Sequence, residues 1–434
     1  MTTLSTLDHP VPRELAGGER LVRNFLFLAT FLLAWFTTSP FPDLGNQQAA
    51  TGGTGGDLVS QASAVLMTGA LALYVLVKRP ALLLRAVTLP LVITLLAFAT
   101  SAVLSSYPDV AGRRLALAIF NIFQASVLLL LPYGREHFAR LLTVAAIVIL
   151  AACYFGVVFL PQFSIHQATD IAEPGLAGDW RGFFTHKNGA GAGMVLLIFI
   201  GIFIYRTWNR SAGVVIAALS ATFLHFTHSK SPINLLPVVL LMSYLVPRLR
   251  SGFVAFVLIV CVPFTLNLLS VGSVMFAPIH GLIAHLMSDP TYTGRNVIWQ
   301  FALDHVRQRP LFGFGYEAFW GMPNLVTDWN YLESWGYRAS DAHNGYLNLA
   351  VTTGLVGLGL SLWWMIAQPF ADYWRGRFQA IDRPLATLFL QIWLFALCLG
   401  CYESVFFAGG SAPWFLTISA IVGLRFRTLA RSAA

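Results

Sequence analysis

Long apolar runs constrain the fold of this chain more than any other feature. About twelve of them follow one another, separated by short polar segments, and 57% of the 434 residues are hydrophobic while 11% are charged. In soluble domains about a quarter of the residues are charged. In a lipid bilayer the backbone must satisfy its own hydrogen bonds, so such runs form helices. We therefore predict an all-α polytopic membrane protein, with residues 1–434 forming a single integral membrane domain.

The predicted transmembrane helices follow the apolar runs. Several runs are shorter than the ~20 residues that cross a bilayer squarely, so the ends of the helices are approximate. The first run is interpreted as a retained span, because no convincing small-residue cleavage site follows it. The predicted spans are residues 24–38, 58–77, 84–104, 113–132, 138–160, 189–205, 211–228, 233–247, 252–275, 345–367, 385–403 and 412–425.

The basic residues predict the orientation of these spans. The net charge of +8 is spread over short loops, which is typical of membrane topogenesis and does not indicate binding to nucleic acid. If the N-terminus is cytoplasmic and the spans alternate, 18 of the 27 Lys and Arg residues lie on the cytoplasmic side. Both termini are therefore predicted to be cytoplasmic. Arg113 and Arg114 are the main exceptions to this bias.

The cysteines give no sign of a metal centre. Cys153, Cys261, Cys398 and Cys401 all lie in or beside apolar runs. Their spacing indicates neither a metal site nor a disulfide framework. The predicted outer side also lacks an Asp-rich cation motif. The sequence therefore predicts no cofactor and no metal.

Two predicted outer segments are long, approximately residues 161–188 and 276–344. Loops of this size in a compact protein are usually functional. Within the second, residues 296–309 have the pattern of an amphipathic helix lying against the membrane or the bundle. Residues 312–316 are too rich in glycine and aromatic side chains for a long helix and are predicted to form a docked turn. The predicted inner face of the amphipathic helix comprises Val297, Phe301, Leu303 and Val306.

A polar segment meets an apolar run at His343 to Gly357, which reads HNGYLNLAVTTGLVG. A histidine thus lies just before the N-terminal end of a predicted membrane helix. Asp341 and Asn344 are the expected capping residues of that helix. An imidazole titrates near neutral pH and can accept a proton there. Gly354 and Gly357 allow another backbone, or a lipid-linked substrate, to come close. The alternative is an ordinary surface histidine in a capping region.

Basic residues on the predicted outer side run against the topological bias and are candidates for binding an anion. Arg295 follows a glycine at the start of the predicted loop helix, where a cation beside free N–H groups makes a good phosphate site. Lys230 is flanked by two serines in a short turn and is a second candidate for binding the anion. The alternative interpretation is that its side chain reaches toward lipid headgroups. Arg181, among interfacial aromatic residues, is a third candidate for the same anion pocket.

Glu403 is a further candidate for a functional residue, because an acid near the end of a membrane helix is unfavourable unless it is paired or hydrated. It either takes part in the site or forms a salt bridge with one of the outer arginines. His186 is instead expected to be a satisfied interfacial histidine.

The residues around His343 resemble the O-antigen ligase and polymerase family of bacterial envelope glycosyltransferases. Ligases of this family carry His, then Asn, Ser or Gln, nine residues, Gly, two residues, then Gly, Thr or Tyr. His343, Asn344, Gly354 and Gly357 fit each of these positions. The histidine also follows a long outer loop and precedes the tenth of twelve predicted spans, as in the family.

Two further segments extend the resemblance to about residues 180–410. Residues 294–299 look like the Gly-Arg segment of the family, and residues 309–315 follow it with RPLFGFG. One departure lies in the turn after the seventh predicted span. Many members have Ser-Arg there, whereas this chain has Ser229-Lys230, which keeps the charge but loses the bidentate fork of arginine.

The resemblance implies a GT-C-type glycosyltransferase in the bacterial inner membrane, with its active site facing the periplasm and residues 276–344 as a large periplasmic loop. It implies inverting, metal-independent transfer of a glycan from a polyprenyl (undecaprenyl) diphosphate carrier to an acceptor sugar hydroxyl. In that reaction His343 accepts the proton, supported by Asn344 and Glu403. The residues expected to stabilise the diphosphate are Arg295, Lys230 and Arg181.

The acceptor distinguishes two activities within the family. The strings WRGFFTHKNGAG, SKS, GFGYEAFW and CYES look more like exopolysaccharide polymerases than core ligases. Polymerisation of exopolysaccharide or O-antigen repeat units is therefore the first expectation, and transfer to lipid A-core by a ligase is the alternative.

A transporter of lipid-linked glycans is the non-enzymatic alternative. Transporters usually show charges at the middle of spans and repeat symmetry, and neither is clear here. The expected partners are a lipid-linked oligosaccharide donor, a glycan acceptor and membrane lipids, without nucleic acid.

Overall fold

The computed structural model describes residues 17–45, 58–78, 87–286, 289–322, 339–377 and 383–431. Within these ranges every regular element is a helix, and the one β-type contact is an isolated antiparallel bridge between Ile165 and Trp180. The predicted all-α class is therefore confirmed for the described part of the chain.

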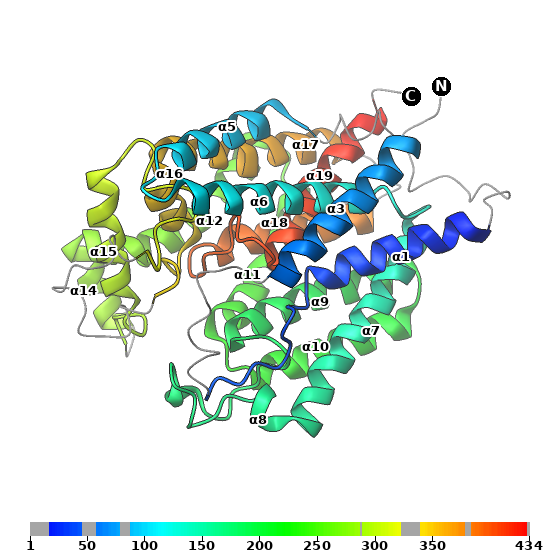
Figure 1. Ribbon diagram of the computed structural model, residues 1–434, viewed down its shortest axis with the longest axis horizontal. Helices are drawn as coiled ribbons and strands as arrows, with labels where there is room; N and C mark the ends of the chain where they lie inside the picture. Colours follow the sequence, from blue (N-terminus) through cyan, green and yellow to red (C-terminus); the bar gives the residue numbers. More distant parts are fainter. Residues whose placement is uncertain are drawn as a thin grey trace.

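Each predicted span overlaps a helix (Figure 1). The ninth continues after α12 as the short helix α13 (Val271–Met275), and the tenth passes from α16 through a π-helical turn, η5 (Trp363–Ala367), into α17 (Gln368–Gly376). The twelve helices that overlap the predicted spans are α1 (Gly17–Leu33), α3 (Leu58–Lys78), α5 (Leu89–Val103), α6 (Pro108–Leu128), α7 (Arg135–Phe159), α9 (Lys187–Thr207), α10 (Arg210–Phe226), α11 (Lys230–Leu245), α12 (Gly252–Leu269), α16 (Gly345–Leu362), α18 (Arg383–Leu399) and α19 (Ala412–Arg431).

Six helical segments of the described chain are long and apolar enough to cross a membrane. Four shorter apolar helices of 10–17 residues accompany them, namely Leu89–Val103, Arg210–Phe226, Arg383–Leu399 and Ala412–Phe426. The structure thus supports a helical membrane protein, while twelve crossings and their orientation stay predictions. The six segments are Leu58–Lys78, Arg135–Phe159, Lys187–Thr207, Lys230–Arg248, Gly252–Leu269 and Gly345–Gly376.

The core of the bundle lies around α9 and α18. The α9 helix packs against α7, α10 and α18, and α18 also packs against α11 and α19. Both helices are apolar on nearly every side, which is the pattern of a helix surrounded by other helices or lipid. In contrast, α3 and α12 are equally apolar but mostly exposed, as expected for helices that face lipid.

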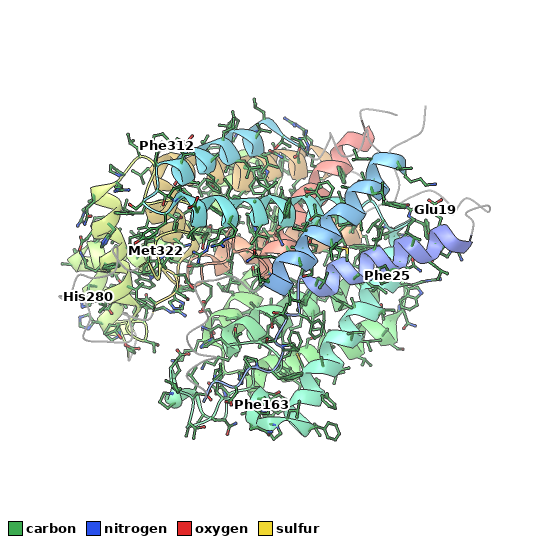
Figure 2. The ribbon with its side chains drawn as sticks, in the orientation of Figure 1. Glu19, Phe25, Phe163, His280, Phe312 and Met322 are labelled. Atoms are coloured by element: carbon green, nitrogen blue, oxygen red, sulfur yellow. The ribbon has the colours of Figure 1, made fainter. Side chains whose placement is uncertain are left out.

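The segment between α13 and α16 lies at one end of the bundle. It contains α14 (Ala277–Leu286) and α15 (Arg295–Gln308), which appear at the left of Figure 1, opposite the start of α1. Figure 2 shows His280, Phe312 and Met322 at that same end, with Glu19 at the other. The α15 helix packs against α13 and α16, so the long loop is docked onto the bundle.

The predicted amphipathic helix is confirmed as α15, but the predicted inner face is wrong for part of its length. The buried residues are Ile298, Trp299, Phe301 and Ala302, while Leu303 and Val306 pack only at the margin. The indole N–H of Trp299 donates to the carbonyl oxygen of Ala342 at 3.1 Å. The face of α15 that bears Trp299 therefore packs toward the segment before α16. Periodicity alone does not reveal this long-range contact.

The predicted docked turn is also confirmed. The backbone N–H groups of Phe314 and Gly315 donate to the carbonyl oxygens of Val351 and Thr352 at 3.0 and 2.9 Å. Gly354 has φ +71° and interrupts the helical conformation of α16. A Cβ atom at Gly354 would overlap the backbone of Leu311, so a glycine is needed for this close approach. The turn is thereby fixed on the first turns of α16.

Candidate active site

The start of α16 is held by the side chain of Asn344. Its Oδ1 accepts from the N–H of Leu347 at 2.9 Å, which is the hydrogen bond of an N-cap residue. Its amide donates to Asn267 Oδ1 at 2.8 Å and to the Cys401 carbonyl oxygen at 2.9 Å. The predicted capping role is confirmed, and the same side chain ties α16 to α12 and to the segment after α18.

His343 precedes this cap in a constrained backbone conformation. Its φ is +46°, in the region that residues other than glycine rarely occupy. The carboxylate of Asp341 accepts the backbone N–H of His343 at 2.7 Å and lies 3.8 Å from its ring Nδ1. Asp341 therefore fixes the backbone and faces the ring, and the His343 side chain remains partly exposed. Strained conformations of this kind are common at functional sites.

Glu403 joins His343 to Arg295. Its Oε1 lies 3.0 Å from a terminal nitrogen of the Arg295 guanidinium, and its Oε2 lies 3.6 Å from Nδ1 of His343. The guanidinium also donates to the carbonyl oxygen of Tyr402. The three side chains come from the start of α15, the segment before α16 and the segment after α18. The expected salt bridge between Glu403 and an outer arginine is confirmed, and that arginine is Arg295.

The charges of this cluster depend on one another. Burial raises the pKa of Glu403, but the charge of Arg295 and the hydrogen bond and charge of His343 outweigh it and lower the pKa to about 2. For His343, burial lowers the pKa, whereas the hydrogen bond with Glu403 and the charge of Asp341 leave it above its usual value. The geometry therefore favours an ionised Glu403 beside an imidazole of increased basicity.

A chain of polar side chains connects this cluster to the turn before α11. The amide of Asn188 donates to Glu403 Oε1 at 2.9 Å, and the hydroxyl of Ser229 donates to Asn188 Oδ1 at 2.8 Å. Lys230 follows Ser229 as the first residue of α11, and its side chain is exposed. Lys230 is thus next in sequence to a residue of this polar chain, whereas Arg295 contacts Glu403 directly.

Arg181 lies in a different environment from the predicted one. Its side chain is fully buried, and its guanidinium donates to the carbonyl oxygens of Phe184 at 3.0 Å and Pro42 at 2.8 Å. Burial lowers its pKa, with Asp170 and Asp43 opposing the shift. These contacts join the segment after α1 to the segment before α9. We therefore leave Arg181 out of the diphosphate site proposed below.

The histidine at position 186 is satisfied, as expected from the sequence. Its Nδ1 accepts the N–H of Asn188 at 3.1 Å as the N-cap of α9, and its Nε2 lies 2.7 Å from Glu173. Nearby, Asp179 binds both Lys187 at 2.6 Å and His228 at 2.7 Å. These pairs order the segment between α7 and α9, which carries Asn188 into the site.

Glu317 is a residue of the site that sequence reasoning missed. It lies in the docked turn with φ +52°, its carbonyl oxygen accepts from Arg114, and its Oε1 accepts from the amide of Asn348 at 3.1 Å. Burial raises its pKa to about 7, with Arg114 opposing and Asp341 adding to the shift. Asn348 lies one turn after Asn344, so Glu317 borders the His343 cluster.

Two features of the sequence, at Arg114 and at Glu317 itself, could have indicated this role. Arg114 ran against the positive-inside bias, and Glu317 is an acid within the aromatic and glycine-rich string GFGYEAFW. The structure pairs them through the Glu317 carbonyl oxygen. The basic residue that departs from the predicted charge bias therefore has a structural partner in the docked turn.

The fold and the site together define a helical membrane protein with a polar, charged centre at one end of its bundle. Residues 215–362 match the family described as O-antigen ligase, a segment that contains Lys230, Arg295 and His343. The match confirms, for this segment, the predicted resemblance to the O-antigen ligase and polysaccharide polymerase family. The description of that family names an enzyme.

A relative adds to this assignment. A stretch of 72 residues is 33% identical to the exopolysaccharide production protein ExoQ of Rhizobium meliloti (strain 1021). The stretch covers 16% of this chain and 17% of that protein, so the similarity spans about a sixth of each.

Proposed function

We propose that this protein transfers a glycan from a polyprenyl (undecaprenyl) diphosphate carrier to an acceptor sugar hydroxyl at the periplasmic face of the bacterial inner membrane, and that it thereby polymerises exopolysaccharide repeat units. The O-antigen ligase family match and the similarity to an exopolysaccharide production protein support this reaction class. The observation that carries the proposal is the placement of Arg295 and His343 on the two oxygens of the Glu403 carboxylate.

Arg295 suits the stabilisation of the leaving diphosphate. As the bond between the anomeric carbon and the diphosphate oxygen breaks, negative charge grows on that oxygen, and a fixed cation lowers the energy of this state. A guanidinium has five N–H donors, so Arg295 can hold Glu403 and the Tyr402 carbonyl and still donate to a phosphate oxygen. Lys230, exposed at the adjoining turn, supplies a second positive charge.

His343 suits the role of general base. Its Nδ1 faces Glu403 and Asp341, so Nε2 is the nitrogen that takes the proton of the acceptor hydroxyl. The acceptor oxygen then forms a bond to the anomeric carbon on the face opposite the leaving diphosphate, which inverts this centre. Glu403 stabilises the imidazolium that results. In this proposal protein cations carry the charge stabilisation and the transfer is metal-independent.

The test uses purified, reconstituted protein and a polyprenyl diphosphate oligosaccharide donor. We expect release of polyprenyl diphosphate together with products that grow by whole repeat units, in the presence of a chelator as well as without it. Movement of intact donor across the membrane without release would instead support the transporter. Loss of transfer on chelation would overturn the metal-independent mechanism.

The O-antigen ligase activity is the second candidate, because the matching family carries that description. Its acceptor would be lipid A-core. A ligase given both acceptors would attach a single preformed glycan to lipid A-core and leave lipid-linked repeat units unextended. The length distribution of the products therefore separates the two activities.

A further inference from the structure

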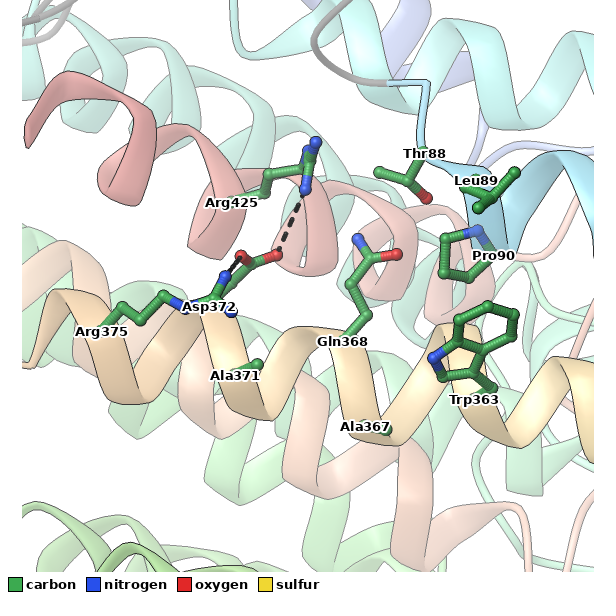
Figure 3. Close-up of a pocket in the computed structure, with 10 residues that line it drawn as sticks. All are labelled: Thr88, Leu89, Pro90, Trp363, Ala367, Gln368, Ala371, Asp372, Arg375 and Arg425. Carbon is green, nitrogen blue, oxygen red and sulfur yellow. Dashed lines mark ion pairs between the residues drawn. The ribbon is translucent and has the colours of Figure 1, made fainter. Parts of the chain in front are cut away.

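A cavity with a few charged and polar residues in its lining lies far from His343. It has a volume of about 350 Å³ and is bordered by the start of α5, by η5 and α17, and by α19 (Figure 3). The helix from Gly345 to Gly376 runs from the His343 site toward this cavity. At 1.5 Å per residue, roughly 40 Å separate His343 from Asp372 on the cavity floor. The cavity is therefore distinct from the proposed active site.

The floor of the cavity holds a buried carboxylate between two arginines. Asp372 on α17 is 3% exposed, and its two oxygens lie 3.8 Å from Arg375 and 3.8 Å from Arg425. Figure 3 shows these ion pairs, with Arg425 reaching the carboxylate from α19. Both distances exceed the 2.7–2.9 Å that is typical of charge-assisted hydrogen bonds. The two ion pairs therefore lack the close contact of a hydrogen-bonded salt bridge.

Two acceptor atoms at this floor lack hydrogen-bond donors. Among the described residues, neither Oδ2 of Asp372 nor Oε1 of Gln368 accepts a hydrogen bond, although both atoms are buried. These residues are four apart on one helix and lie on the same side of it, as Figure 3 shows. Buried polar groups normally find a partner, and an unmet acceptor is unfavourable. The site therefore calls for a ligand that donates hydrogen bonds.

The mouth of the cavity is apolar and faces outward. Leu89 and Trp363 line it and are 66% and 41% exposed, and Pro90 lies beside them. Tryptophan and arginine are frequent at the boundary between lipid tails and headgroups. A ligand that fits both parts has an apolar body against Leu89 and Trp363, and a polar head that reaches Asp372.

We propose that this cavity binds the headgroup of a phospholipid that carries both a phosphate and a primary ammonium group. The phosphate lies between Arg375 and Arg425, and the ammonium donates to Asp372 and Gln368. A primary ammonium has three N–H donors and thus meets both open acceptors. A trimethylated ammonium has no N–H donor, and a glycerol headgroup has hydroxyl donors but no positive charge to offer the Asp372 carboxylate. The proposal does not depend on the reaction at His343.

The experiment compares lipids by native mass spectrometry of the full-length, purified protein. The probes are phosphatidylethanolamine, phosphatidylcholine and phosphatidylglycerol with the same acyl chains, added to delipidated protein in equal amounts. We expect phosphatidylethanolamine to be retained about tenfold more than either other lipid, because only its headgroup brings both N–H donors and a positive charge to Asp372. Equal retention of all three, or preferred retention of phosphatidylglycerol, would overturn the proposal.

Two variants locate the binding. Gln368→Met removes one acceptor of the ammonium while keeping a similar volume, and it should abolish the preference for phosphatidylethanolamine. Arg425→Gln removes a cation that contacts the phosphate, and it should weaken the retention of all three lipids. Arg206→Gln, at an exposed residue in the last turn of α9, is the matched control and should keep the preference. The melting temperature of each variant, with and without lipid, checks that it is folded. A preference that survives in folded Gln368→Met would place the lipid elsewhere and contradict the assignment.

Discussion

Nδ1 of His343 lies 3.6 Å from Oε2 of Glu403, although the two residues are far apart in the sequence. The other oxygen of the same carboxylate binds Arg295. One acid thus joins the proposed base to the proposed diphosphate cation. A change at any of the three therefore alters the electrostatic environment of the other two, and this coupling underlies the first three predictions.

His343→Ala should lose about 10²–10⁴-fold in the rate of glycan transfer, the usual cost of removing a positioned general base. His343→Gln should be similarly inactive, because an amide keeps hydrogen bonding but cannot take the proton. Both variants should still bind the lipid-linked donor in a sedimentation assay with proteoliposomes. Turnover of His343→Gln near the wild-type rate would mean that the histidine only orients substrate, and Glu403 would be the next candidate for the base.

Arg295→Ala should reduce the transfer rate by about 10²–10³-fold, comparable to the loss of one donor that stabilises a developing oxyanion. Lys230→Arg should stay within a few-fold of wild type, because it exchanges one exposed cation for another. Single-turnover rates with saturating donor measure both effects. Equal, near-native rates in the two variants would refute the assignment of Arg295 to the diphosphate.

The pH dependence of transfer tests the pairing of His343 with Glu403. Because the neutral imidazole is the reactive form, the rate should fall as pH decreases through the pKa of His343, which lies above its usual value. Glu403→Gln removes a hydrogen bond and a negative charge that raise this pKa. The acidic limb of the profile should therefore move to lower pH.

Two controls belong to that measurement. Asp341→Asn should shift the limb in the same direction, because the charge of Asp341 also raises the pKa of His343. Glu136→Gln, at an exposed residue of α7, should leave the profile unchanged. A limb that stays in place in Glu403→Gln would show that His343 is not the titrating group.

Glu317 should make stability depend on pH. Its pKa is about 7 in the folded protein, against 4.5 for a glutamate free in water, so the folded state holds its proton more tightly. The resulting stabilisation is full below about pH 4.5 and is lost as pH rises through about 7. The difference in melting temperature between wild type and Glu317→Gln should therefore change over this window and level off above it. A difference that is constant with pH would contradict a protonated Glu317.

The orientation of the bundle is tested by cysteine accessibility. In a Cys-less background, a cysteine at position 330 should react with a membrane-impermeant reagent from the periplasmic side, and one at position 248 from the cytoplasmic side. Position 330 lies outside the described residues, whereas Arg248 follows α11 and is exposed. Labelling of position 330 only from the cytoplasm would refute the predicted topology.

Local patterns in the sequence were sufficient for the helices and for the start of α16. Each apolar run in the sequence overlaps a helix of the structure. Asn344 was identified as a cap because capping depends on residues within one turn. The position of Arg295 at the first turn of α15 followed from the same kind of pattern. The family resemblance around His343 likewise rests on spacing within a short segment.

Only the tertiary structure decided which of these groups meet. It paired Glu403 with both Arg295 and His343, added Asn188 and Glu317, and directed Arg181 to backbone carbonyl oxygens instead of the site. It also turned α15 onto Trp299, against the face that periodicity predicted. A hydrophobic pattern specifies a helix and its apolar sides through neighbours three and four residues away. The meeting of four distant loops depends instead on how α9 packs against α18 and α15 against α16, and that packing is a property of the whole bundle.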